Sequence, residues 1–476
     1  MGVSCKIHSL NTSNTSNLFH SLSTYLSRRV HPASLGMFRI LFGLVMFMQT
    51  VWFIATDFVQ KNISEPIIHF KYYYFQFLEP LSPLGMQILM WMMLLASALI
   101  VIGILYRASV FVFLMSFTYL WLLDKGFFNN HYYLITLLSL LLLFIKGDSW
   151  GVLKWKERNK TNKKKSIYYI SQWQIFLLKA QISIVFLVAG INKLNPYWLS
   201  HFQPMDYILD AKADISGLAF LRSTGMAIFF TYGGLIIDLV AVFLLWWKRT
   251  RVIGIITLVG FNFLNFWLFW NIGEIGIFPF LLLATIVLFL EPDTPAKWFK
   301  SHSSSTVHRS PSTASTRPPT VHRLSFAVLA CYLVFQLLFP FRHLLYPGHV
   351  DWTGEGQRFA WRMKTMLKEA DIQFFIKDND GGKYPVEVSK MLSSKQYNNL
   401  IYYPDFIPPI ARRLKEEALK QGIPEPEVVA DFKVKFMGVH PSQPIVAPET
   451  DLSRVRVSAI RHSDWILPLK TKTIDK

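Results

Sequence analysis

Two groups of polar residues lie at the ends of long apolar runs. There they could transfer protons at a site that is shielded from water. Asn129, Asn130 and His131 begin one run, and Asn192 and Lys193 end the next one. A histidine can donate or accept a proton near neutral pH. A lysine can act as a base where an apolar setting disfavours its ammonium form. Because ionisable groups in membrane spans are functional candidates, these residues suggest proton-transfer chemistry at a membrane-embedded site.

Each group also has a structural interpretation. A lysine at a helix end commonly extends its charge to the membrane interface, and asparagines before a helix commonly cap its first turn. Arg39 and Asp238 also lie within apolar runs, and we expect them to pair with other polar groups rather than to catalyse. No Walker loop, GxSxG, HExxH or CxxC motif occurs, and the histidines show no zinc-ligand spacing. Metal catalysis is therefore not expected.

The composition places most of the chain in a lipid bilayer. Of 476 residues, 52% are hydrophobic and only 17% are charged, against roughly 25% charged in soluble domains. Most of the nine apolar runs approach the roughly 20 residues that a membrane-spanning helix needs. The runs are 36–59, 83–105, 108–124, 130–146, 171–193, 225–247, 251–271, 275–291 and 324–345. We predict an all-α multi-pass membrane domain of about nine transmembrane helices.

Basic residues orient these spans. The net charge is +19, and Lys and Arg crowd the connections 154–165, 248–251 and 297–323. Nine spans with a cytoplasmic N-terminus place all three connections in the cytoplasm, as the positive-inside rule requires. The same topology puts His131 and Lys193 at the outer ends of their helices, at a shared depth. Nucleic-acid binding is not expected, because no stripe of basic and stacking aromatic residues occurs elsewhere.

Three regions are predicted. Residues 1–30 form a polar cytoplasmic N-terminus, and residues 31–345 form the transmembrane domain. Within that domain, the Ser-, Thr- and Pro-rich stretch makes 296–323 a flexible cytoplasmic loop. Residues 346–476 form a small extracytoplasmic α+β domain.

Local patterns predict the elements of the α+β domain. Residues 373–388 have the pattern of a hairpin with an Asp/Gly turn. Residues 408–419 are expected to form a helix that begins at a Pro pair. Residues 428–437 alternate partly like a strand, and 453–460 are a further candidate strand. Cys5 is expected in the cytoplasm and Cys331 inside the ninth span, so the two cannot meet. The outer domain is therefore expected to have no disulfide, which favours a bacterial cytoplasmic membrane over the endoplasmic reticulum.

Several short motifs occur in a fixed order along the chain. The two most specific are LLDK at 122–125 followed by NNH at 129–131, and AGINKL at 189–194. The others are Phe38-Arg39, Tyr106-Arg107, Gly233-Gly234, Asp238-Leu239, Trp361 and Met363. In order and spacing they resemble the vitamin K-dependent γ-carboxylase family, whose membrane part is the horizontally transferred transmembrane (HTTM) domain.

The resemblance implies a vitamin K-dependent γ-glutamyl carboxylase-like membrane enzyme. Such an enzyme oxidises vitamin K hydroquinone with O2 to the 2,3-epoxide and couples this to the carboxylation of peptide glutamate with CO2. Lys193 matches the family's catalytic base, and His131 matches its catalytic histidine. The expected quinone-binding residues are Asn130, Phe128, Trp361, Met363 and Asn265. The implied partners are a glutamate-containing protein or peptide and membrane lipid, and the implied co-substrates are vitamin K hydroquinone, O2 and CO2, without a metal.

Some positions depart from the family pattern. Asn262 stands where many members carry a histidine, and Asn192 stands where the animal enzymes carry a second lysine. The chain ends at Lys476, without the long extension of the animal enzymes. Two alternatives therefore stay open: a quinol epoxidase without carboxylation, and a non-catalytic membrane protein that binds quinone or lipid.

Overall fold

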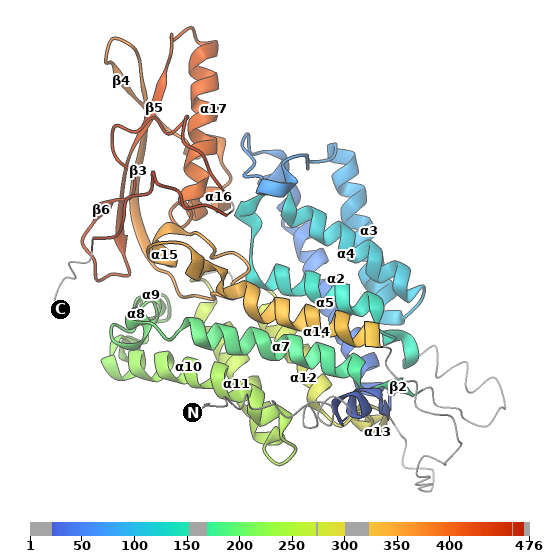
Figure 1. The fold of residues 1–476 in the computed structure, drawn as a ribbon. Coiled ribbons are helices and arrows are strands. Elements are labelled where there is room, and N and C mark those ends of the chain that lie inside the picture. The colour runs from blue at the N-terminus through green and yellow to red at the C-terminus, as the bar shows by residue number, and fades with distance from the viewer. Residues whose placement is uncertain (1–20, 152–168, 273–274, 300–322, 459, 471–476) are drawn as a thin grey trace, which may run out of the picture.

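The protein consists of a bundle of apolar helices and a four-stranded sheet that stands over one end of it (Figure 1). The structure is a computed structural model and describes residues 21–151, 169–272, 275–299, 323–458 and 460–470. The HTTM-like motifs lie in the bundle. The elements that line its sheet-facing end determine the site described below.

Six helices of the described residues are long and apolar enough to cross a membrane. They are α2 (Ala33–Ala55), α3 (Pro83–Ile102), α7 (Trp173–Asn192), α10 (Thr224–Trp246), α11 (Arg251–Phe269), and the segment Phe326–Leu345, in which η6 (Phe339–Leu345) continues α14 (Arg323–Leu338). Three predicted runs form shorter apolar helices: α4 (Tyr106–Leu122), α5 (Asn130–Phe144) and α12 (Phe278–Phe289). The membrane class is confirmed, whereas the count of nine membrane-spanning helices is not.

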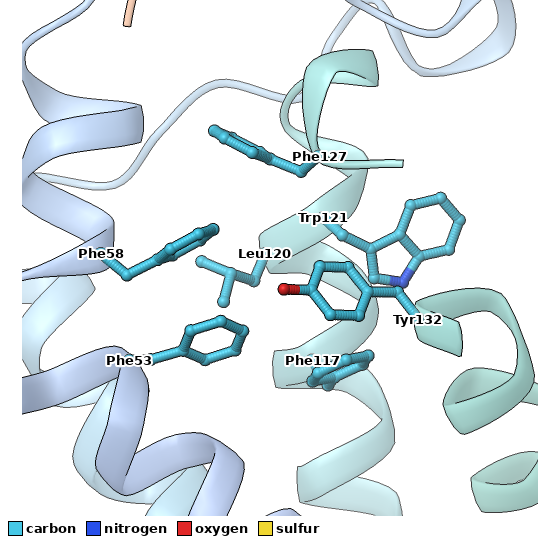
Figure 2. A pocket seen from close by; sticks show the side chains of 7 residues that line it. All are labelled: Phe53, Phe58, Phe117, Leu120, Trp121, Phe127 and Tyr132. Atoms are coloured by element: carbon cyan, nitrogen blue, oxygen red, sulfur yellow. The ribbon is translucent and has the colours of Figure 1, made fainter. Parts of the chain in front are cut away.

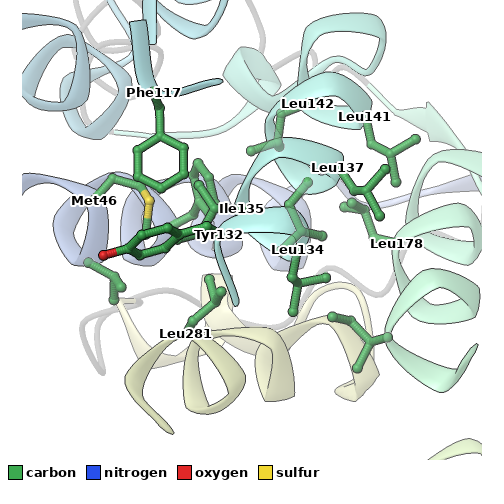
Figure 3. Close-up of a cluster of buried hydrophobic side chains, with 14 of the residues drawn as sticks. Met46, Phe117, Tyr132, Leu134, Ile135, Leu137, Leu141, Leu142, Leu178 and Leu281 are labelled. Carbon is green, nitrogen blue, oxygen red and sulfur yellow. The ribbon is translucent and has the colours of Figure 1, made fainter. Parts of the chain in front are cut away.

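Helix α5 lies at the centre of the bundle, which accounts for its shortness (Figure 3). Its side chains are buried around most of the helix, and they pack against Met46 of α2, Phe117 of α4, Leu178 of α7 and Leu281 of α12. A helix that is apolar on all faces needs an apolar surrounding, which either lipid or other protein elements can supply. Neighbouring helices rather than lipid surround α5, so the bilayer thickness does not set its length.

A tightly packed aromatic cluster fixes the first turn of α5 (Figure 2). Tyr132 points into rings from α2 and α4, and its ring lies 5.4 Å from that of Phe117 in an edge-on arrangement. The other members are Phe53, Phe58, Leu120, Trp121 and Phe127. Edge-on aromatic pairs stabilise packing beyond the area they bury. The cluster therefore holds the residue next to Tyr132, His131, in a defined position.

The C-terminal sheet has the strand order β4-β3-β5-β6 and is antiparallel throughout. Its strands are β3 (Lys368–Lys377), β4 (Lys383–Val386), β5 (Glu427–Phe436) and β6 (Gln443–Pro444), and α17 (Ile407–Lys420) packs against it. The register pairs Phe374 with Val386 across the hairpin. The predicted hairpin, helix and strand of this domain are confirmed.

The remaining elements are short. The helices are α8 (Pro196–Leu199), α9 (Met205–Ser216), α13 (Thr294–Trp298), α15 (Val350–Thr353) and α16 (Ser394–Leu400), and β1 (Arg29–Val30) pairs with β2 (Ile170–Ser171). The single-turn segments are η1 (Gln60–Ser64), η2 (Tyr73–Phe75), η3 (Lys125–Phe127), η4 (Gly147–Ser149), η5 (Ala219–Arg222), η7 (Ser389–Met391) and η8 (Pro404–Phe406).

Two local predictions need correction. Residues 453–458 form no strand, because the Asp451 carboxylate accepts hydrogen bonds from the Ser453 backbone and hydroxyl and from Val428 N–H, which creates a turn. Residues 296–298 of the predicted flexible loop belong to α13, and 300–322 lie outside the described residues. In the predicted N-terminal region, residues 21–27 are helical and 1–20 lie outside the described residues. The domain boundaries stay predictions.

Charged and polar groups fix the sheet domain to the bundle. Asp405 accepts from Lys125 Nζ at 2.7 Å and from both terminal nitrogens of Arg358 at 3.0 and 3.2 Å. Burial by itself raises the pKa of Asp405, but Lys125 and Arg358 together hold this pKa well below its ordinary value. Asp124, just before Lys125, accepts from Gln396 Nε2 at 2.7 Å. Ionised and polar groups at the end of the LLDK motif therefore hold the sheet domain against the bundle.

A buried lysine of the sheet domain makes its stability depend on pH. Lys368 Nζ donates to the carbonyls of Trp352 and Tyr402 at 2.8 and 3.0 Å, and burial lowers its pKa to about 7. An unfolded lysine keeps its proton up to about pH 10.4. Between these values the unfolded chain binds more protons, so the free energy of unfolding should rise with pH.

We expect this rise to reach about 1.4 kcal/mol per pH unit, the value for one proton. Unfolding of the purified chain in detergent at pH 7, 8 and 9 would measure it. The Lys368→Met variant should have a smaller slope. An identical slope in the variant would show that Lys368 does not cause the pH dependence.

Candidate active site

A cavity of about 660 Å³ lies between the bundle and the base of the sheet domain. Helices α5, α7, α10, α11 and α12 provide its apolar walls, with residues such as Phe186, Phe230 and Phe278. The segment 362–366 and helix α16 contribute to its outer wall. The cavity is large enough for a small organic ligand, and ligand pockets of this kind combine apolar walls with a few convergent polar groups.

Lys193 is the C-terminal cap of α7 and lies in the cavity wall with 8% of its surface exposed. Its Nζ donates to Asp238 Oδ2 of α10 at 2.6 Å and lies 4.8 Å from the centre of the Trp198 ring. Gly190 allows α7 and α10 to approach, because a Cβ there would lie 2.6 Å from Leu239 Cδ2. The close helix packing thus brings lysine and aspartate together.

His131 faces the same cavity from the first turn of α5 and is 6% exposed. Its ring lies 6.0 Å from that of Phe278. Gly276 adopts a left-handed backbone with φ of 52°, and a Cβ there would lie 3.4 Å from His131 Nε2. Among the described residues no hydrogen-bond partner contacts the imidazole. A nearly buried ring without such a partner is available to a bound ligand.

The outer ends of α5 and α7 are joined by one segment of the C-terminal region. Asn130 Nδ2 donates to the Arg362 carbonyl at 2.9 Å, and Asn192 Nδ2 donates to the Ala360 carbonyl at 2.7 Å. The Arg362 guanidinium returns a hydrogen bond of 3.0 Å to Asn192 Oδ1 and forms a two-pronged ion pair with Asp351. The asparagines that precede His131 and Lys193 therefore bind residues 359–364, which form the roof segment of the cavity.

The roof segment has an unusual backbone. Phe359, Trp361 and Lys364 have φ values of 63°, 54° and 53°, in the left-handed region that residues other than glycine rarely adopt. Such strain persists where surrounding contacts over-determine the conformation, and it often occurs at binding sites. The hydrogen bonds from Asn130 and Asn192 supply such contacts here.

The charge of the cavity lining is predominantly positive. Lys193, Arg362, Lys364 and Lys395 line it, and Asp238 is the one carboxylate side chain among the described lining residues. Of these cations Lys193 and Arg362 are buried, and a cation near a ligand stabilises an oxyanion more strongly where the local dielectric constant is low. The site can therefore hold a ligand that becomes negatively charged when it loses a proton.

Comparison with known families assigns both parts of the chain. The HTTM domain matches residues 27–294, and the vitamin K-dependent gamma-carboxylase lumenal domain matches residues 321–472. The chain belongs to the vitamin K-dependent gamma-carboxylase family. No solved structure shows significant similarity to it. The lumenal match implies that the C-terminal part of this family member is extracytoplasmic.

Most of the residues that the carboxylase resemblance singled out line this one cavity. They are Lys193, His131, Asn130, Phe128, Met363 and Asn265. Trp361 is not among the lining residues: it is fully buried, and its ring stacks on Tyr133 at 5.0 Å. Six of the seven residues that the resemblance singled out therefore share one cavity.

The two departures from the carboxylase pattern have structural roles. Asn262 is buried and donates to the Leu258 carbonyl of its own helix at 2.8 Å, and it is not among the lining residues. Asn192 binds the roof segment, as described above. A lysine at 192 could not accept the hydrogen bond from Arg362.

The sequence did not indicate that Trp198 and Gln357 line the cavity, and it did not show which residue pairs with Asp238. Asp238 was expected to pair with a polar group, but its partner Lys193 could not be named. Trp198 lies in α8, beyond the AGINKL motif, and Gln357 lies four residues before Trp361. These residues lie close in sequence to residues of the motifs, and this closeness could have suggested that they belong to the site. Closeness in sequence does not, however, indicate which side chains point into a cavity.

Proposed function

We propose that this chain is a membrane enzyme that oxidises a vitamin K hydroquinone with O2 to the 2,3-epoxide and uses the reaction to carboxylate peptide glutamate with CO2. The observation that carries the proposal is the buried Lys193–Asp238 pair, 2.6 Å apart, in an apolar cavity that His131 also lines. The bound hydroquinone, together with O2, would supply the strong base that removes a γ-proton from glutamate.

The cavity fits a prenylated aromatic quinol. Its walls are apolar and aromatic, and two of its polar lining atoms, Gln357 Oε1 and Asn130 Oδ1, are buried without a hydrogen-bond partner among the described residues. Buried acceptors of this kind are costly unless a ligand or water donates to them. A hydroxyl group on an aromatic ring is such a donor, so these residues and His131 would hold the quinol.

In this proposal Lys193 acts as the base and Asp238 holds its proton. An ammonium–carboxylate pair and an amine–carboxylic acid pair differ by one proton moved along the 2.6 Å hydrogen bond. Removal from water disfavours the charged pair. The proton on Asp238 Oδ2 would leave Lys193 Nζ as a neutral amine, able to accept a proton from a phenolic hydroxyl.

His131 and Asn130 would orient the ligand, and the apolar walls would exclude water. A strong base and a carbanion are quenched rapidly by water, so exclusion of solvent protects both. The positive lining from Arg362, Lys364 and Lys395 would stabilise negative charge at the site. Lys193 and His131 are thus the proposed catalytic residues, and Asn130, Phe128, Met363 and Asn265 are proposed to contact the quinone.

The test uses the purified chain in nanodiscs with vitamin K hydroquinone, O2, labelled bicarbonate and a short peptide that contains glutamate. We expect epoxide together with label in the peptide. A matched peptide with Gln in place of Glu should take up no label, because it lacks the acidic side chain that accepts CO2.

Other results would favour the alternatives. Epoxide without label in any glutamate peptide would indicate a quinol epoxidase. That enzyme would use the same lysine, Lys193, as its base. Neither product, with intact protein that binds quinone, would indicate a non-catalytic quinone- or lipid-binding protein. We further propose a bacterial cytoplasmic membrane with the N-terminus in the cytoplasm. A glutamate-containing protein is the proposed partner.

A further inference from the structure

Two adjacent glycines of α10 leave open space in the wall of the cavity. Gly233 and Gly234 both line it. A Cβ at Gly233 would meet no atom within 4 Å, and a Cβ at Gly234 would meet only Lys193 Nζ, at 3.9 Å. The missing side chains therefore create room directly beside the proposed base.

Helix packing does not require these glycines. At Gly190 a Cβ would overlap Leu239, so that glycine is needed for the contact between α7 and α10. At Gly233 and Gly234 a side chain would enter the cavity instead. Glycine in a helix interior is less favourable than alanine. The pair thus destabilises α10 slightly and enlarges the cavity.

The same part of the cavity reaches the lipid-facing surface. Phe229, one turn before Gly233, and Leu264 of α11 both line the cavity, and they are 61% and 37% exposed. In a membrane helix, apolar side chains with this exposure face lipid. An apolar chain attached to a ring beside Gly234 could therefore leave the cavity between α10 and α11.

Two polar groups show that this space suits an occupant that forms hydrogen bonds, either water or a ligand. Gln357 is 7% exposed and lines the cavity, and its Oε1 has no hydrogen-bond partner in the part of the chain that the structure describes. His131 is equally buried and faces the same space. Their presence distinguishes this cavity from a packing defect, because dry voids in proteins are lined by apolar groups.

We propose that Gly233 and Gly234 determine which quinones the site accepts, by leaving room for a fused two-ring naphthoquinone beside Lys193 while its prenyl chain passes Phe229 and Leu264 into lipid. The inference rests on the proposed function and deepens it. It assigns ring-size specificity to α10 rather than to the residues that carry charge.

The test measures binding of the oxidised quinone, so that it does not depend on turnover. The purified chain in nanodiscs is titrated with phylloquinone and with a prenylated single-ring benzoquinone, and tryptophan fluorescence and the melting temperature are followed. Gly234→Ala should change the dissociation constants little. Gly234→Leu should weaken naphthoquinone binding about tenfold to a hundredfold, the range expected from overpacking, and should weaken benzoquinone binding less.

Gly260→Leu is the matched control. Gly260 lies in α11, a Cβ there would meet no atom within 4 Å, and it is not among the described residues that line the cavity. It therefore receives the same gain in helix propensity and should bind both quinones as wild type does. Gly233→Leu provides a second variant in case Gly234→Leu does not fold.

The outcomes separate the two claims. If folded Gly234→Leu and Gly233→Leu bind both quinones like Gly260→Leu, the specificity role is wrong while the proposed function stands. If both ring types lose affinity equally, the glycines provide space without selecting ring size, and the inference is also overturned. If wild type binds neither quinone, the proposed function itself fails.

Discussion

Replacement of Lys193 by methionine is expected to lower epoxide formation about 10²- to 10⁴-fold, the range that a positioned general base contributes. Methionine keeps much of the side-chain volume but can neither accept a proton nor pair with Asp238. Any carboxylation coupled to the reaction should fall by the same factor. Epoxide and peptide label, measured in nanodiscs under saturating hydroquinone, would report both quantities.

Lys179 provides the matched control for this substitution. It lies in the same helix and is also buried, but its Nζ lies over the Trp246 and Phe289 rings, 5.4 Å from each centre. It is not among the described residues that line the cavity. Lys179→Met should keep activity within a few-fold of wild type. Full epoxide formation by Lys193→Met would exclude Lys193 as the base.

Loss of Asp238 is expected to destabilise the protein as well as to inactivate it. Removal of one partner from a buried ion pair leaves an uncompensated charge and costs about 3–5 kcal/mol. Asp238→Ala would leave Lys193 Nζ without the 2.6 Å hydrogen bond, over the Trp198 ring. We expect a clearly lower melting temperature in detergent and no detectable epoxide.

A double variant separates stability from chemistry. Lys193→Met combined with Asp238→Leu replaces both charges with apolar groups, and such replacement is often neutral or stabilising. The double variant should therefore recover most of the lost stability and remain inactive. If it regained activity, the proton exchange proposed for the pair would be wrong. If Asp238→Ala were as stable as wild type, the pair would not be desolvated as described.

The pair also explains why one lysine and one aspartate can occupy a membrane helix bundle. Each charge alone would be expensive in an apolar setting, and together they satisfy one another until a proton moves between them. The roof segment is likewise stabilised by polar groups that come from other parts of the chain. Its left-handed residues are held by Asn130 and Asn192, the residues that precede His131 and Lys193. Helices α5 and α7 are therefore coupled to the roof segment by two amide side chains.

The family could be recognised from short motifs because their residues are neighbours in sequence. LLDK, NNH and AGINKL each lie at one helix end. A few neighbouring residues therefore show both the polar groups and their place at the end of a helix. The predicted hairpin and the helix 408–419 were correct for the same reason, since turn residues and helix periodicity act over a few positions. The candidate strand was wrong over residues 453–458 because a strand needs a partner, and Asp451 organises a turn there instead.

The number of spanning helices could not be obtained this way. Apolar runs of 12 to 17 residues are ambiguous, because hydrophobicity does not distinguish lipid from the side chains of other helices. Helix α5 has 15 residues and a run of leucines, and it is surrounded by helices on the inside of the bundle. Only the packing arrangement shows that its apolar character reflects burial in protein.

The sequence by itself determined the membrane class, the family and the two residues proposed for proton transfer. Tertiary structure decided which groups meet: Asp238 contacts Lys193 from 45 positions away, and Arg362 receives the Asn130 hydrogen bond from 232 positions away. It also placed Trp361 outside the cavity lining and left the space beside Gly234 open. A cavity is the volume that packed helices leave unfilled, so it depends on which faces of distant helices come together, and no local pattern records that.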